Sequence, residues 1–165
     1  ENIEPDIIAL AKGLGGGFPV GAVMAKAEVG DAMVPGTHGS TFGGNPLAMR
    51  SANAVLELLL ENDFLSNLRK MIVYFDKKMD ELIKNDMQNN PIIFAKKGSG
   101  MLRGFQLNED VTAGDFSNIA REKSLLLVGA AENTIRLLPP LNTSKEEVDN
   151  AFDILNDIVL ELKKT

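Results

Sequence analysis

The stretch AKGLGGGFPVGAVMA, residues 11 to 25, places a lysine directly after a short apolar run and follows it with glycines. The preceding run, residues 6–10 (DIIAL), predicts a buried strand that enters a glycine turn, and residues 20–25 predict a second strand. Ligand crevices form at strand ends of α/β sheets, and glycines let a bulky group approach the backbone. Lys12 is therefore a candidate amine nucleophile for a cofactor that carries a carbonyl group.

This stretch of sequence has two alternative interpretations. Lys12 could be a surface lysine before a turn, because lysines are rarely buried without a partner. The glycines could form a phosphate cradle, but they match neither the GxGxxG pattern ahead of a helix nor a GK[ST] loop. The glycine turn alone is therefore weak support for any site.

The segment PGTHGSTFGGNP, residues 35–46, contains too many glycines and prolines for a regular element and predicts a long, shaped loop. Ser40 and Thr41 offer hydroxyl groups there, and the neighbouring glycines leave backbone NH groups accessible, which together suit a phosphate. The alternative is a polar turn that only caps the next helix, with Asn45 as N-cap and Pro46 at the first helical position.

Arg136 interrupts the apolar run IRLLPPL, residues 135–141. The planar guanidinium of an arginine pairs with a carboxylate through two parallel hydrogen bonds, so an amino acid or keto acid is a candidate ligand. The alternative is an arginine on an edge strand that forms a structural salt bridge.

The remaining pattern predicts the end of an α/β domain, a connecting helix and a small α+β domain. We place the boundary between residues 1–62 and 63–165. The expected elements are two helices, or one bent near Asn62 and Asp63, over 47–62 and 64–85; a hairpin over 91–107 that turns near 98–100; a helix over 115–123; strands over 124–128 and 134–139; and a final helix that Ser144 and Glu147 cap.

Composition narrows the function. The 165 residues are 44% hydrophobic and 24% charged, as in globular proteins, and the formal net charge of −6 argues against nucleic-acid or anionic-membrane binding. Without cysteine and with a single histidine, neither a disulfide framework nor a thiolate or histidine-rich metal site is expected. No run approaches the length of a membrane span and no signal segment is recognisable, so we expect a cytoplasmic protein, with the mitochondrial matrix as the alternative.

Taken together, the motifs resemble one family, the class III aminotransferases that depend on pyridoxal 5'-phosphate (PLP), and among them most closely the acetylornithine aminotransferases. PDIIALAKGLGGGFPVGAVMA resembles the family's lysine segment, PGTHGSTFGGNPLA its phosphate loop, and GSGMLRGFQL with TIRLLPPL its C-terminal domain. The resemblance covers nearly the whole chain, and the order and spacing of the segments agree.

This resemblance implies roles for four residues. Lys12 would hold PLP as a Schiff base and act as the general acid and base of transamination. Thr41 would bind the cofactor phosphate from the neighbouring subunit of a homodimer with a shared active site, and Ser40 would lie beside the substrate. Arg136 would hold the carboxylate of glutamate or 2-oxoglutarate.

The expected reaction is transfer of an amino group from N-acetylornithine to 2-oxoglutarate, in arginine biosynthesis. Ornithine or 4-aminobutyrate aminotransferase activity is the alternative within the family, and a non-catalytic dimerisation module is the alternative outside it. The family's other cofactor and substrate residues have no counterpart in this sequence, among them the aspartate that pairs with the ring nitrogen. We therefore expect the chain to be a C-terminal fragment that is inactive alone.

Overall fold

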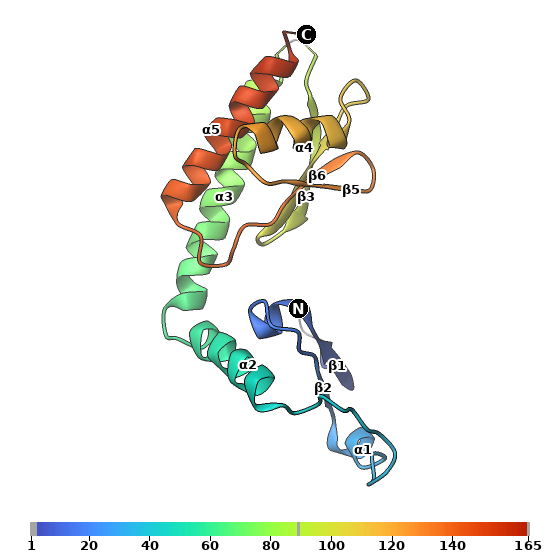
Figure 1. Cartoon of the computed structure of the whole chain (residues 1–165). Helices are drawn as coiled ribbons and strands as arrows, with labels where there is room; N and C mark the ends of the chain where they lie inside the picture. The colour runs from blue at the N-terminus through green and yellow to red at the C-terminus, as the bar shows by residue number, and fades with distance from the viewer. Residues whose placement is uncertain (1–2, 89, 165) are drawn as a thin grey trace. The chain divides into compact units, whose positions relative to one another are not determined.

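The computed structural model describes residues 3–88 and 90–164 (Figure 1). The chain divides into two compact units, Glu1–Leu65 and Ser66–Thr165. Each unit has its own sheet, and the two are described separately below.

The first unit contains an antiparallel pair of short strands and three helical segments. Its elements are β1 (Ile7–Leu10), the 3-10 helix η1 (Lys12–Gly15), β2 (Ala22–Ala25), α1 (Ala27–Gly30) and α2 (Pro46–Leu59). Ile7 pairs with Ala25 and Leu10 with Ala22, so η1 and the glycines lie in the connection between the two strands. Both predicted strands are confirmed, although the second begins at Ala22.

The burial expected for the first strand is wrong for this chain. Three residues of β1 and all four of β2 are exposed, including the large side chains of Ile7, Val23 and Met24. The physical reason is the size of the sheet, because β1 and β2 pair only with each other. A two-stranded ribbon cannot bury both of its faces.

The segment between α1 and α2 is irregular, as the sequence predicted. Asn45 then begins α2: its Oδ1 accepts a hydrogen bond from the backbone NH of Ala48 at 2.9 Å, and Pro46 occupies the first turn. The helix ends at Leu59, and α3 begins at Phe64. Residues 47–85 therefore form two helices, which decides between the two alternatives left open above.

The second unit is a four-stranded antiparallel sheet with three helices. Its elements are α3 (Phe64–Asp86), β3 (Ile93–Ser99), β4 (Leu102–Leu107), α4 (Ala113–Glu122), β5 (Val128–Ala130), β6 (Thr134–Leu137) and α5 (Lys145–Leu162). The strand order is β3-β4-β6-β5, so β4 and β6 are the interior strands. The expected hairpin, the strand with Arg136 and the final helix are confirmed.

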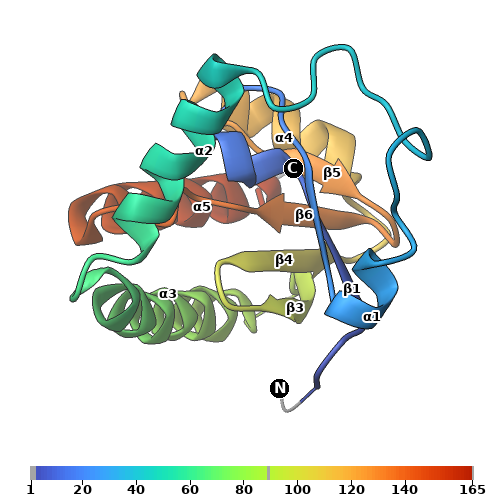
Figure 2. The same ribbon diagram turned by 90° about the horizontal axis from the view of Figure 1, so that it is seen from below.

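The hydrophobic core of the second unit joins one face of the sheet to α3, α4 and α5 (Figure 2). Ile135 and Leu137 of β6 are buried in it, whereas Arg136 between them is exposed. The largest fully buried apolar side chains are Phe105, Phe116, Met79, Ile135, Leu155 and Ile158. Arg136 therefore lies on the face of the sheet that the helices do not cover.

The two long helices of the second unit run in the same direction side by side (Figures 1 and 2). At their C-terminal ends, the buried carboxylate of Asp86 lies 2.8 Å from Nζ of Lys163 and accepts a hydrogen bond from the backbone NH of Ile93. At its N-terminal end, α5 has the predicted capping box, in which Ser144 and Glu147 bond each other's backbone NH groups.

The strand expected over residues 124–128 is wrong, because β5 is Val128–Ala130. Ser124 has a left-handed backbone (φ 66°), and the NH of Leu125 bonds back to the carbonyl of Ala120. These residues end α4 rather than start a strand, and Leu125 and Leu127 pack against the core. Pairing with β6 begins only at Val128.

Candidate functional site

Lys12 is the first residue of η1 and has a positive φ of 52°. Non-glycine residues seldom adopt this conformation, and such strain concentrates at functional sites. The side chain is exposed and forms no ion pair within the described part of the chain. An amine on a fixed, strained turn is thus available to an external group.

The glycines after Lys12 let helix α2 approach the turn. A Cβ on Gly16 would lie 2.9 Å from Cγ2 of Val55 in α2, and the φ of Gly16 is 59°. Gly16 is therefore required by packing and by backbone conformation together. Gly13, immediately after the lysine, has open space where its Cβ would be.

Ser40 and Thr41 lie in the exposed loop that leads into α2. The NH of Gly43 donates to the carbonyl of Ser40, which closes a turn, and neither hydroxyl has a hydrogen-bond partner in the ranges 3–88 and 90–164. A histidine in such a polar loop is predicted to form a hydrogen bond within the loop, but the side chain of His38 has no hydrogen-bond partner in the same ranges. The loop therefore presents free hydroxyls one turn ahead of the α2 N-terminus, a chemistry that suits an anion.

Arg136 occupies β6, between β4 and β5. Its cross-strand partners are Gly104 on one side and Val128 on the other, and neither carries a charge. The guanidinium is exposed and has no carboxylate partner among the residues described. The alternative of an edge-strand arginine in a structural salt bridge is therefore wrong.

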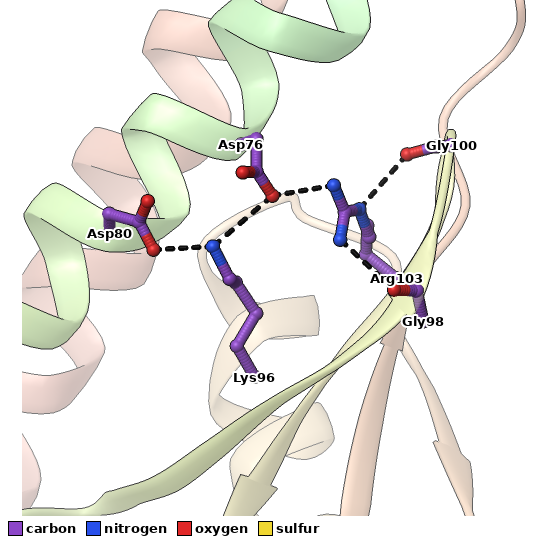
Figure 3. Close-up of polar contacts among 6 residues, drawn as sticks. All are labelled: Asp76, Asp80, Lys96, Gly98, Gly100 and Arg103. Carbon is purple, nitrogen blue, oxygen red and sulfur yellow. Dashed lines mark hydrogen bonds and ion pairs between the residues drawn. The ribbon is translucent and has the colours of Figure 1, made fainter.

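Arg103, on the neighbouring strand β4, has the opposite surroundings (Figure 3). Its side chain is 12% exposed and forms an ion pair with Asp76 of α3. It also donates to the carbonyl oxygens of Gly98 and Gly100, at 3.0 Å each. These contacts fasten the β3–β4 turn to the helix, so Arg103 serves the fold.

The pattern of charged residues from Asp76 to Lys84 predicts a solvated helix face, but two of its carboxylates have partners within the fold. Lys96 of β3 points to this helix and bonds both Asp76 and Asp80 (Figure 3). The hydrogen bond to Asp80 raises the pKa of Lys96 above its usual value. The sequence contained no local sign of these pairs, because their partners lie at least 16 residues apart.

The second lysine of β3 also has a carboxylate partner. Lys97 of β3 pairs with Glu132, and this hydrogen bond lowers the pKa of the Glu132 carboxyl. Lys96, Lys97 and Arg103 therefore each have a carboxylate partner. Among the cations of the described strands, Arg136 alone is left for an external anion.

Three of the four sequence-predicted site residues, Lys12, Ser40 and Thr41, belong to the first unit, and Arg136 belongs to the second. Within residues 3–88 and 90–164 there is no group of three or more His, Cys, Asp or Glu side chains that could hold a metal ion. No helix in the same ranges is long and apolar enough to cross a membrane.

Comparison with known proteins agrees with these features. The family model for "Aminotransferase class-III" matches residues 1–159. An acetylornithine aminotransferase of Aquifex aeolicus is 41% identical over 158 residues, which cover 96% of this chain and 39% of the relative. One from Oceanobacillus iheyensis is 39% identical over 161 residues, covering 98% of this chain and 39% of the relative.

The chain belongs to the class-III aminotransferases. Two solved structures show the same fold. The ornithine δ-aminotransferase of Plasmodium falciparum has a TM-score of 0.87 at 30% identity, over 99% of this chain and 41% of that one. The acetylornithine aminotransferase of Elizabethkingia anophelis has a TM-score of 0.86 at 33% identity, over 97% and 42%. The expected fold class, part of a PLP-dependent transferase fold, is confirmed.

The chain spans about 40% of the length of these class-III relatives. The family depends on PLP, and the residues of the first unit fit that cofactor: a free amine at Lys12 for its aldehyde, and free hydroxyls at Ser40 and Thr41 for its phosphate. PLP is the cofactor of the family. The roles of Lys12, Ser40 and Thr41 toward it are proposed below.

Proposed function

We propose that this chain provides the lysine, part of the phosphate site and a carboxylate site of an aminotransferase that transfers the amino group of N-acetylornithine to 2-oxoglutarate. The single observation that carries the proposal is Lys12, an exposed, unpaired lysine with a φ of 52° in a turn that α2 packs against. A positive φ is uncommon at a residue other than glycine and is concentrated at functional sites, which supports a functional role for this exposed lysine.

Each residue has a distinct task. The Nζ of Lys12 would hold the cofactor and would move a proton at the reacting carbon of the substrate. The hydroxyl of Thr41 binds the phosphate, and Ser40 lies beside the substrate. Arg136 binds the carboxylate of the keto acid. The chemistry that bound PLP supplies is an aldehyde for the amino group and a ring that withdraws electrons from the adjacent bond.

The choice of amino donor rests on the names of the relatives. The curated proteins cited above are named acetylornithine aminotransferase, which supports N-acetylornithine and a place in arginine biosynthesis. The solved ornithine δ-aminotransferase supports ornithine as the alternative. A homodimer with a shared active site, inactivity of this chain alone, and a cytoplasmic location remain predictions.

Chemical labelling tests the proposal. The complete enzyme that contains this chain is mixed with PLP and reduced with borohydride, and the labelled peptide is mapped; we expect the label on Lys12. Lys12→Ala should abolish the label and the absorbance of bound cofactor. Lys84→Ala, which removes another exposed lysine without an ion pair in the described ranges, is the matched control. A label elsewhere would disprove the role of Lys12, and the absence of any label would favour a non-catalytic dimerisation module.

A further inference from the structure

The position opposite Arg136 on the outer strand is a valine. In the β5–β6 ladder Val128 pairs with Arg136, and its side chain is 61% exposed. Residues directly opposite in an antiparallel pair have Cβ atoms about 4.5–5.5 Å apart on the same face of the sheet. A carboxylate at residue 128 would therefore reach the guanidinium and neutralise it.

The position on the other side of Arg136 cannot carry a side chain at all. A Cβ on Gly104 would lie 2.7 Å from Cγ2 of Thr134 and 3.0 Å from the carbonyl oxygen of Ile135. Packing against β6 thus keeps residue 104 a glycine. Of the two cross-strand neighbours, only residue 128 is free to vary, and it decides whether Arg136 has a partner within the sheet.

The surroundings of Arg136 are also apolar. Leu138, two residues further along the chain, is 62% exposed, and Val128 presents its side chain to solvent beside the guanidinium. The one carboxylate nearby in the strand connection, Glu132, is taken by Lys97. The combination of a free guanidinium and exposed hydrocarbon matches a carboxylate attached to an aliphatic chain.

We propose that Val128 is a specificity-determining residue, which keeps Arg136 unpaired for the carboxylate of an external keto acid and offers an apolar surface to its carbon chain. This inference rests on the proposed function of Arg136. It adds that access to the arginine depends on an uncharged residue at one ladder position, and that an acid there would compete with the substrate.

The test introduces that competitor in the complete enzyme. Val128→Asp should raise the KM for 2-oxoglutarate about three- to tenfold, because the keto acid must then displace a charged cross-strand partner from Arg136. Val128→Glu repeats the test with a longer acid, and Val128→Asn, of nearly the same shape as the aspartate, should have a smaller effect. Val73→Asp places the same charge on an exposed α3 position (71%) and controls for net charge; it should leave the KM unchanged.

Arg136→Gln separates the two proposals. If this variant raises the KM and Val128→Asp adds nothing further in its presence, the acid acts through Arg136 and the inference holds. If Arg136→Gln raises the KM but neither acidic variant does, Val128 has no such role, while the function of Arg136 stands. If Arg136→Gln leaves the KM unchanged, the carboxylate site itself is wrong, and the role of Val128 falls with it.

Discussion

Arg103 and Arg136 lie on adjacent interior strands, yet their guanidinium groups do different things. Arg103 points at α3 and is held by Asp76 and two turn carbonyls, whereas Arg136 is on the uncovered face between Gly104 and Val128. Alternation along the strands puts the two arginines on opposite faces of one sheet. This alternation directs Arg103 to α3, where it stabilises the fold, and leaves Arg136 accessible to a ligand.

The two arginines should therefore differ in their effect on stability. Arg103→Met leaves Asp76 with Lys96 as its one remaining partner and removes the side-chain donor of two carbonyl groups, so we expect a loss of about 1–3 kcal/mol in the free energy of unfolding. Arg136→Gln removes no side-chain ion pair or hydrogen bond in the described ranges and should stay within about 0.5 kcal/mol of the parent chain. Urea denaturation followed by circular dichroism measures both. Equal losses in the two variants would contradict the assignment.

Individual residues were predictable where the physics is local. Asn45 and the pair Ser144–Glu147 cap helices within four residues of chain, and the structure has these caps as expected. The partners of Arg103 and Arg136 were not predictable, because Asp76 is 27 residues from Arg103 and Val128 meets Arg136 only through strand register. A spacing rule cannot supply a register that the whole sheet determines.

At the scale of elements, one carboxylate joins the N-terminal part of α5 to the middle of α3. Asp149 of α5 accepts a hydrogen bond from the hydroxyl of Tyr74 and lies 2.7 Å from Nζ of Lys78, both on α3. Lys78 and Tyr74 lower the pKa of the Asp149 carboxyl, and the bond to Asp149 raises the pKa of the Tyr74 hydroxyl. The contact between Asp149 and Tyr74 therefore changes the titration of a carboxyl group at low pH and of a hydroxyl group at high pH.

Tyr74 is the only tyrosine and the chain has no tryptophan, so an absorbance titration of tyrosinate reports on this one contact. We expect its midpoint above the usual value near 10, and Asp149→Asn should move it back down. Asp153→Asn, an exposed acid one turn further along α5, is the control and should not. An unchanged midpoint in Asp149→Asn would show that the helices are not joined there.

The sign of the stability effect follows from the two directions. The raised pKa of Tyr74 gives a contribution that is present below about pH 10 and is lost as the pH rises through the folded-state value. The lowered pKa of Asp149 gives one that is present above about pH 4 and is lost as the pH falls. The pH dependence of the urea midpoint should therefore flatten at both ends in Asp149→Asn.

The error over residues 124–128 shows where element prediction failed. The run SLLLV has the composition of a strand, but α4 needs Ser124 and Leu125 to end it, and two of the leucines pack into the core without pairing. Apolar composition predicted burial for only part of this run, since Leu126 and Val128 are exposed, and it predicted strand pairing of residues 124–127 incorrectly. Helix termini compete with strands for the same residues, and only the three-dimensional context decides.

At the scale of the whole molecule, hydrophobic burial is unevenly divided. Every residue of the core cluster lies between Phe75 and Val159, in the second unit. In the first unit, the only buried apolar side chains among those described are Ala48 and Ala52. Because burial of apolar surface is the main favourable term in folding, the second unit should have most of the stability of this chain.

Residues 64–165, which keep α3 complete, should therefore fold alone in one cooperative transition, while residues 3–63 alone should show none. The denaturant slope m scales with the surface that unfolding exposes, so the m value of the whole chain should barely exceed that of residues 64–165. Urea titrations of the three chains, followed by circular dichroism and by the fluorescence of Tyr74, measure this comparison. A second transition in the whole chain, or an unfolded 64–165, would show that the first unit contributes stability its own buried residues do not account for. Such a result would mean that the exposed apolar side chains of β1, β2 and α2 also stabilise the folded chain.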